Sequence, residues 1–161
     1  MTTPQSVESD LGWALGTVMR AYLRAVDEVV AGVPGGPRGY QVLASCGREG
    51  PRTQLALAHR LGLDRTVMTY LLDDLQKADL VERRPDPADR RARRVELTEN
   101  GRARLCELAE ALTKAEESLL DRLDPDERNT LRNLLFRLAT GSDTTEGNLC
   151  QVAEKITSET C

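Results

Sequence analysis

The sequence is poor in histidine and in aromatic residues. It has one histidine and one phenylalanine, and aromatic side chains make up only 3% of its 161 residues. A lone histidine, His59, makes a histidine-rich metal site impossible. The core must therefore consist of leucine, valine and alanine, which favours helices. We find no phosphate-binding loop, paired catalytic carboxylates or nucleophile with a partner histidine, so we expect no catalytic residues, metal or cofactor.

The chain also lacks long apolar runs. None approaches the roughly 18 residues that a membrane-spanning helix needs, and the first ten residues lack the basic region and apolar core of a secretion signal. We therefore expect a cytoplasmic protein without a membrane partner. Its cysteines show no metal-ligating or CxxC spacing, so in a reducing compartment we expect free thiols. They are Cys46, Cys106, Cys150 and Cys161.

Acidic residues outnumber basic ones over the whole chain, but positive charge is concentrated in one segment. The net charge of −4 argues against a nonspecific binder of polyanions. Residues 82–104, however, contain eight arginines and five acids, which gives this segment a local charge of +3. A sequence-specific contact with nucleic acid remains possible there.

Residues 53–98 have the order of a helix-turn-helix followed by a β-hairpin. Thr53 can cap a first helix, whose inward residues we expect to be Leu55, Ala58 and Leu61. Gly62 then makes the turn, and Asp64 can cap a second helix. Three- and four-residue spacing predicts the apolar stripe of the second helix. That stripe comprises Val67, Met68, Leu71, Leu72 and Leu75.

The opposite face of the second helix carries Arg65, Thr66, Thr69 and Tyr70 in its first two turns. This end of a recognition helix reaches base edges in the major groove. Arginine can fork onto guanine, and threonine can bond a base or touch a thymine methyl. An ordinary surface helix would show the same polar face, so the neighbouring segments decide between the two interpretations.

The hairpin has an arginine-rich tip. Asp79 tolerates the left-handed backbone that leaves the helix. Residues 80–84 and 91–97 predict two antiparallel strands, and two prolines make residues 85–90 a loop. Four arginines near the tip suit a narrow minor groove, although a solvated charge run paired with Asp86 and Asp89 is the alternative. The arginines are Arg90, Arg91, Arg93 and Arg94.

The hairpin resembles a known family. Asp89-x-Arg91-x-x-x-Val95-x-Leu97-Thr98-x-x-Gly101 is similar to the wing signature of MarR-type transcription regulators. Residues 63–65 and 80–84 are also similar to the family pattern, and the resemblance covers residues 8–140. Tyr70 departs from it where many members carry a basic residue, and Asp79 where glycine is usual. Base preference therefore stays open.

The resemblance implies a mainly α fold with a small β-wing, in which a winged helix-turn-helix lobe joins a helical dimerisation region. It further implies a homodimeric regulator, usually a repressor, that binds an imperfect palindrome in double-stranded DNA. We expect the major groove to be read by Arg65, Thr66, Thr69 and Tyr70, and phosphates to be held by Arg52, Thr53 and Gln54. We expect Arg90, Arg91 and Arg93 to enter the minor groove, with Asp89 orienting an arginine.

The resemblance also implies a small aromatic or lipophilic effector bound between the lobe and the dimerisation region. Five residues are candidates to line its site, although Trp13 fits a dimer-core anchor better. They are Trp13, Met19, Tyr22, Tyr40 and Met68. The alternative function is a thiol-based redox-sensing regulator on the same scaffold, motivated by the four cysteines. An enzyme, or a helical dimer acting only through protein contacts, is disfavoured.

The remaining segments supply the expected dimerisation region. Apolar residues at three- to four-residue spacing predict a long helix over residues 7–33, ended by Pro34-Gly35-Gly36-Pro37. The same spacing over residues 105–123 predicts a helix with a narrow apolar stripe, as a helix–helix contact needs. Asp124 and Pro125 start a last helix. We expect a dimerisation helix in residues 1–37, the DNA-binding lobe in 38–98, dimerisation helices in 99–140, and a polar tail in 141–161 with a weak helical pattern over 149–156.

Overall fold

Helices and one small sheet follow the order that the periodicity predicts. The computed structural model describes residues 10–140, so the expected tail helix over residues 149–156 lies outside the described residues. The mainly helical fold with a small β-wing is confirmed. The elements are α1 (Leu11–Val30), α2 (Pro37–Glu49), β1 (Arg52–Thr53), α3 (Gln54–Arg60), α4 (Arg65–Lys77), β2 (Val81–Pro85), β3 (Arg93–Leu97), α5 (Glu99–Leu119) and α6 (Pro125–Thr140).

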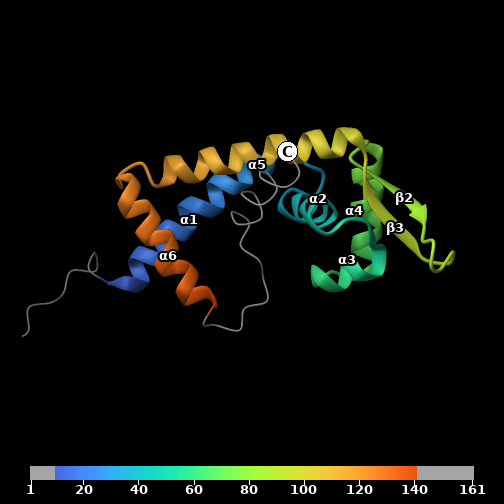
Figure 1. The fold of residues 1–161 in the computed structure, drawn as a ribbon, viewed down its shortest axis with the longest axis horizontal. Coiled ribbons are helices and arrows are strands. Elements are labelled where there is room, and N and C mark those ends of the chain that lie inside the picture. Colours follow the sequence, from blue (N-terminus) through green and yellow to red (C-terminus); the bar gives the residue numbers. More distant parts are fainter. Residues whose placement is uncertain (1–9, 141–161) are drawn as a thin grey trace, which may run out of the picture.

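The elements form an elongated molecule with different contents at its two ends. Helix α5 runs along most of its length and packs against α1 and α2 (Figure 1). Helices α2, α3 and α4 gather at one end with the sheet, and the β2–β3 hairpin projects from that end. Helix α6 lies at the opposite end, near the first half of α1. The hairpin and α6 are therefore separated by the length of α5.

The predicted caps fix where three helices begin. Thr53 accepts a hydrogen bond from the backbone N–H of Ala56 at 3.2 Å, and Thr98 accepts one from Gly101 at 2.9 Å. Asp64 accepts one from Thr66 at 2.7 Å. Each cap satisfies an N–H group that has no partner inside its helix. Helix α1 is shorter than predicted, because its cap is Asp10 and the chain turns after Val30.

Two residues of the predicted inward faces are exposed. Leu55 is 70% exposed and Val67 is 43% exposed, whereas Leu57 and Met68 have no exposed surface. Residues two positions apart in a helix are rotated by about 200° around its axis, so Leu55 and Leu57 cannot face the same core. Ala58 is buried and Leu61 packs against the core as predicted, so the error in α3 is confined to Leu55, since seven residues are too few to define the edge of a stripe. Both exposed side chains lie on the helix-turn-helix.

The core lies where α2 and α5 meet the end of α1 and the lobe. Tyr40 of α2, Leu72 of α4 and Leu105 of α5 are fully buried in one cluster. In α1, only Val26 and Val30, in its second half, are buried. Because Leu105 belongs to this cluster, the first half of α5 is part of the lobe's core.

The sheet has three antiparallel strands in the order β1–β3–β2. Strand β1 was not predicted from the sequence. In the hairpin, Val81 pairs with Leu97 and Arg83 with Val95, so β2 starts one residue later and β3 two residues later than predicted. Arg91 therefore belongs to the turn. Asp79 adopts the predicted left-handed conformation with φ 56° between α4 and the hairpin.

Candidate nucleic-acid interface

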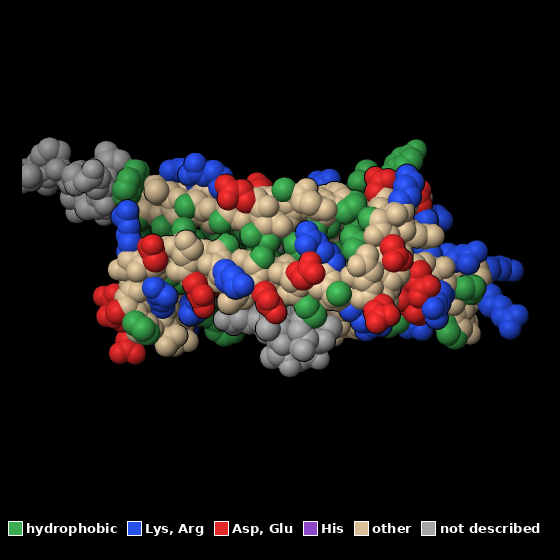
Figure 2. All heavy atoms as spheres, turned by 90° about the horizontal axis from the view of Figure 1, so that it is seen from above, with side chains coloured by type: hydrophobic (Ala, Val, Ile, Leu, Met, Phe, Trp, Pro, Cys, Tyr) green, Lys and Arg blue, Asp and Glu red, His purple; other side chains and the backbone are tan. Residues whose placement is uncertain are grey.

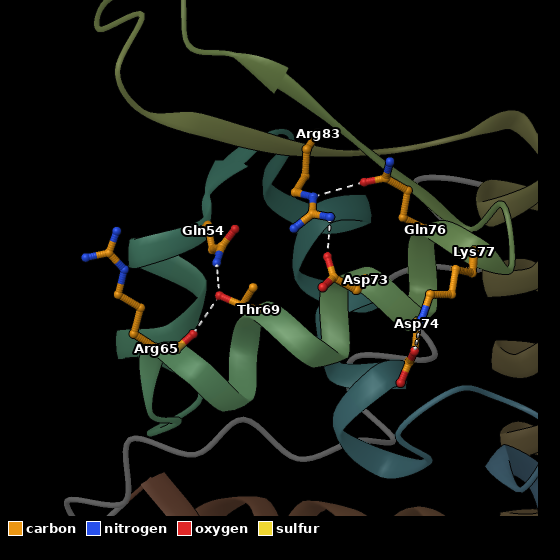
Figure 3. Close-up of polar contacts among 8 residues, drawn as sticks. All are labelled: Gln54, Arg65, Thr69, Asp73, Asp74, Gln76, Lys77 and Arg83. Atoms are coloured by element: carbon orange, nitrogen blue, oxygen red, sulfur yellow. Dashed lines mark hydrogen bonds and ion pairs between the residues drawn. The ribbon is translucent and has the colours of Figure 1, made fainter.

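Helix α4 turns a polar face to solvent because its other face is anchored in the core. Met68, Leu72 and Leu75 are fully buried, so the first two turns of the helix present Arg65, Thr66 and Tyr70 outward. Arg65 forms no ion pair with any residue in 10–140, and its guanidinium extends away from the neighbouring side chains (Figure 3). The cation is therefore available to an external anion or base.

Thr69 and Gln54 are bonded to each other rather than free. The Thr69 hydroxyl donates to the Arg65 carbonyl at 2.9 Å and accepts from the Gln54 side-chain amide at 2.7 Å (Figure 3). This pair ties the start of α3 to α4. The only hydroxyl hydrogen of Thr69 is used inside the protein, so in this conformation a base can meet its methyl group or an oxygen lone pair.

The residues expected to hold phosphates have partners within the protein. Arg52 pairs with Glu49, and the same carboxylate group holds Arg60 at 2.7 Å. The Thr53 hydroxyl caps α3. Of the predicted phosphate-binding group, Gln54 lies nearest to a cleft that opens to solvent.

That cleft has a volume of about 320 Å³ and lies between the helix-turn-helix and the hairpin. It is lined by Gln54, Gln76, Arg83 and Arg93. Arg83 of β2 donates to Gln76 at 2.9 Å and forms an ion pair with Asp73, so it fastens the hairpin to α4 (Figure 3). Sequence reasoning missed Arg83 and Gln76, since their roles depend on contacts between elements.

The hairpin arginines divide into paired and unpaired residues. Arg84 pairs with Glu82 at 2.6 Å, and Arg94 lies 3.7 Å from Asp86. Arg90, Arg91 and Arg93, in contrast, are exposed and form no ion pair with the rest of residues 10–140. Lys and Arg side chains crowd the end of the molecule that carries the hairpin (Figure 2). The alternative of a self-neutralised charge run holds for Arg94 but not for the tip.

Asp89 shapes the turn that carries these arginines. Its carboxylate accepts from the backbone N–H of Arg91 at 2.9 Å, and its carbonyl accepts from Ala92 at 2.9 Å. It is therefore the backbone of Arg91, and not a guanidinium, that Asp89 holds here. The aspartate still sets the direction in which the tip leaves the strands.

The candidate effector residues occupy two different environments. Tyr40 and Met68 have no exposed surface, whereas Trp13 and Met19 on α1 are 45% and 55% exposed. Tyr22 is partly buried against the core. In this conformation Tyr40 and Met68 are fully buried residues of the core.

The two cysteines within residues 10–140 differ. Cys46 is a free, buried thiol that donates to the Val95 carbonyl at 3.7 Å, and burial raises its pKa to about 12. Cys106 on α5 is disulfide-bonded, so the expectation of a free thiol is wrong for this residue. Cys150 and Cys161 lie outside the described residues. Cys46 lacks the exposed, electropositive setting of a reactive thiol.

Two further expectations concern metals and membranes. No group of three or more His, Cys, Asp or Glu side chains within the described range is placed to hold a metal ion. Over residues 10–140, none of the helices is both long and apolar enough to cross a bilayer.

Comparisons with known proteins agree with this geometry. Residues 36–92, which span α2, the whole helix-turn-helix and the hairpin up to the start of β3, match the model of the MarR family. The transcriptional regulator PecS of Dickeya dadantii is 28% identical over 130 residues, which cover 77% of this chain and 78% of PecS.

Solved structures give the same result. The apo form of wild-type MarR from E. coli superposes with a TM-score of 0.67 at 28% identity, covering 80% of this chain and 96% of MarR. The transcriptional repressor CouR, solved on a 23-mer DNA duplex, gives 0.66 at 28% identity, covering 86% of this chain and 99% of CouR. The chain belongs to the MarR family of winged-helix transcriptional regulators.

Proposed function

We propose that the protein is a homodimeric repressor that binds a pseudo-palindromic site in double-stranded DNA. One observation carries the proposal. In a chain with a net charge of −4, the unpaired Arg65, Arg90, Arg91 and Arg93 lie on α4 and on the hairpin beside it. Unpaired cations on a recognition helix and a wing match the phosphates and base edges of a duplex. CouR, a repressor, was solved on such a duplex.

Each half of the interface has a separate role in this proposal. The start of α4 enters the major groove, where Arg65 reaches a base edge. The hairpin tip places Arg90 and Arg91 in the adjacent minor groove, whose narrow form concentrates negative potential. The cleft between them, with Arg83 and Arg93 in its lining, faces the backbone that separates the two grooves. Gln54 is the neutral donor at that backbone.

Dimerisation accounts for the apolar faces that one chain leaves uncovered. Helix α6 has no buried residue, and Leu134, Leu135 and Phe136 are 45–51% exposed. In the first half of α1, Leu15, Val18 and Met19 are 51–55% exposed. A band of hydrophobic side chains is visible along one face of the molecule (Figure 2). A second copy packed on residues 1–37 and 99–140 would cover these faces and present two lobes to successive turns of DNA.

A small-molecule effector would act on the spacing of the two lobes. A small aromatic or lipophilic compound that favours a lobe spacing mismatched to DNA would lower affinity by shifting the population of dimers. Trp13, Met19 and Tyr22 on α1 are the candidates that a ligand can reach without opening the core. A phenolic acid that raises the melting temperature without weakening DNA binding would show binding without regulation.

The test uses a duplex selected by the protein from a random-sequence library. Replacing Arg90 and Arg91 by alanine should weaken binding and flatten the slope of log K against log salt by up to about one unit for each phosphate that the variant no longer binds. The matched control is Arg20→Ala/Arg24→Ala, the same change of charge on α1. Selection of no duplex, or equal salt slopes for the two double variants, contradicts the proposal.

A redox-sensing regulator on the same scaffold is the second candidate, and the disulfide at Cys106 favours it. If this thiol is the sensor, reduction should change DNA affinity in the wild type and have no effect in Cys106→Ser. DNA affinity that is the same in reduced and oxidised wild-type protein excludes the redox candidate and leaves the DNA-binding proposal intact.

A further inference from the structure

Exposed large apolar side chains occur in three places within residues 10–140. Two of these places, α1 and α6, are the faces assigned above to the dimer. The third is the helix-turn-helix itself, where Leu55 is 70% exposed, Tyr70 67% and Val67 43%. These three side chains are not needed for the core of the lobe, which Leu57, Met68 and Leu72 fill.

The polar groups of the same helix are largely hydrogen-bonded or ion-paired within the protein. The Thr69 hydroxyl is bonded to Gln54 and to the Arg65 carbonyl. The backbone N–H of Thr66 donates to the Asp64 carboxylate at 2.7 Å, which lowers the pKa of Asp64. In the next turn, Asp73 is neutralised by Arg83. The Arg65 guanidinium, which forms no ion pair within residues 10–140, is therefore the cationic donor that α4 presents together with these apolar side chains, and the exposed Thr66 and Tyr70 hydroxyls are neutral donors.

Val67 and Tyr70 are placed to meet bases if α4 enters the major groove. They are the third and sixth residues of the helix, and a spacing of three makes them neighbours on its surface. The apolar feature of the major groove is the 5-methyl group of thymine. Arg65 lies on the same helix, and strand β2 of the arginine-tipped hairpin packs against α4; the cations of Arg65 and of the hairpin tip form no ion pair within residues 10–140, so they favour a polyanion over an apolar protein partner.

We infer that Val67 and Tyr70 read thymine methyl groups in the operator, while Arg65 supplies the hydrogen-bonded contact. This inference rests on the proposed function and adds the class of base that the protein prefers. Sequence preference then depends on methyl contacts, and the Thr69 hydroxyl contributes mainly by holding α3 against α4. Each half-site should contain at least one thymine that uracil cannot replace.

The experiment replaces single thymines of the library-selected duplex by deoxyuridine, which removes only the methyl group. At a contacted position, affinity should fall about fourfold, the value of one buried methyl-sized group. Uracil at positions outside the footprint serves as the DNA control. The quantity compared between variants is the ratio of thymine to uracil affinity at each position, which cancels any general loss of binding.

Val67→Ala and Tyr70→Ala should each bring this ratio close to one at a position where the wild type discriminates. Tyr70→Phe, which keeps the ring, should retain the wild-type ratio. Arg38→Ala, at an exposed residue of α2 outside the assigned DNA and dimer contacts, is the protein control and should leave every ratio unchanged.

The inference is overturned if uracil is tolerated at every position, or if Val67→Ala and Tyr70→Ala keep the full preference for thymine. Either result leaves the proposed function standing, because the duplex is still bound. Failure to select any duplex would instead contradict the proposed function itself.

Discussion

At the scale of single residues, local chemistry decides which side chains are available for contact. The wing arginines have the same intrinsic charge, yet Arg84 and Arg94 have acidic partners while Arg90 and Arg91 form no ion pair within residues 10–140. The residues that could be assigned from sequence are those with local causes. Asp64 caps α4 through a group two positions away, and Asp79 takes its left-handed conformation at the helix end. Partners across the fold, such as Gln54 for Thr69, leave no signal in the spacing.

Cys46 gives a prediction about pH. Its pKa of about 12 in the folded protein, raised from 9.0 mainly by burial, means that only the unfolded chain ionises this thiol in the interval between. Ionisation of the unfolded state favours unfolding, so the free energy of unfolding should fall as pH rises from about 9 to 12. Urea denaturation of wild type and Cys46→Ala over this interval measures the effect.

The wild type should lose stability relative to Cys46→Ala as pH rises, because alanine cannot ionise. At a pH of about 8 the native thiol should also resist alkylation until the protein unfolds. Parallel pH profiles for the two proteins, or rapid alkylation of native Cys46, would show that this thiol is accessible to solvent.

At the scale of elements, the position of the hairpin depends on contacts between segments. Strand β1 has only two residues, Arg52 and Thr53, and it exists because Val95 and Arg94 pair with it from β3. No alternation can be read in two residues, so the sequence does not predict this strand. The hairpin was predictable, because prolines and alternating residues mark its loop and strands locally. Its attachment to α4 through Arg83 was not.

Arg83→Gln should reduce DNA affinity by up to about fivefold. The substitution frees the hairpin from α4 and leaves the Asp73 carboxylate unneutralised near the phosphates. Fluorescence anisotropy with the selected duplex measures the affinity. The double variant Asp73→Asn/Arg83→Gln removes both charges and should recover part of the loss, since no unpaired carboxylate remains.

Arg102→Gln, at an exposed arginine on α5, is the control for removing one positive charge. If it weakens binding as much as Arg83→Gln does, or if the double variant recovers nothing, net charge rather than the link to α4 explains the result.

At the scale of the whole molecule, the two ends of α5 differ in whether one chain is enough to bury the apolar side chains there. The lobe end has a complete core within one chain, whereas α6 at the other end buries no residue. Periodicity predicted both apolar faces, but a pattern cannot state whether the partner of a face is in the same chain. This is why the core could be predicted more fully than the assembly.

Leu134→Glu combined with Leu135→Glu should convert the dimer to a monomer. Both leucines are about half exposed in one chain, so the lobe should stay folded. Losing two buried leucines from an interface should raise the dissociation constant at least about 100-fold. Sedimentation equilibrium measures the mass and circular dichroism checks the fold. Asn133→Glu on the same helix is the control and should remain dimeric. A wild-type monomer, or a dimeric double variant, would show that these helices have another partner.

The most direct test of the central claim is a hydroxyl-radical footprint of the full chain on its selected duplex. The account predicts two protected regions about one helical turn, roughly 34 Å, apart. Each should be flanked by a protected stretch of minor groove that disappears with Arg90→Ala/Arg91→Ala, while protection opposite α4 remains. A single protected region, or minor-groove protection that persists in the double variant, would contradict it.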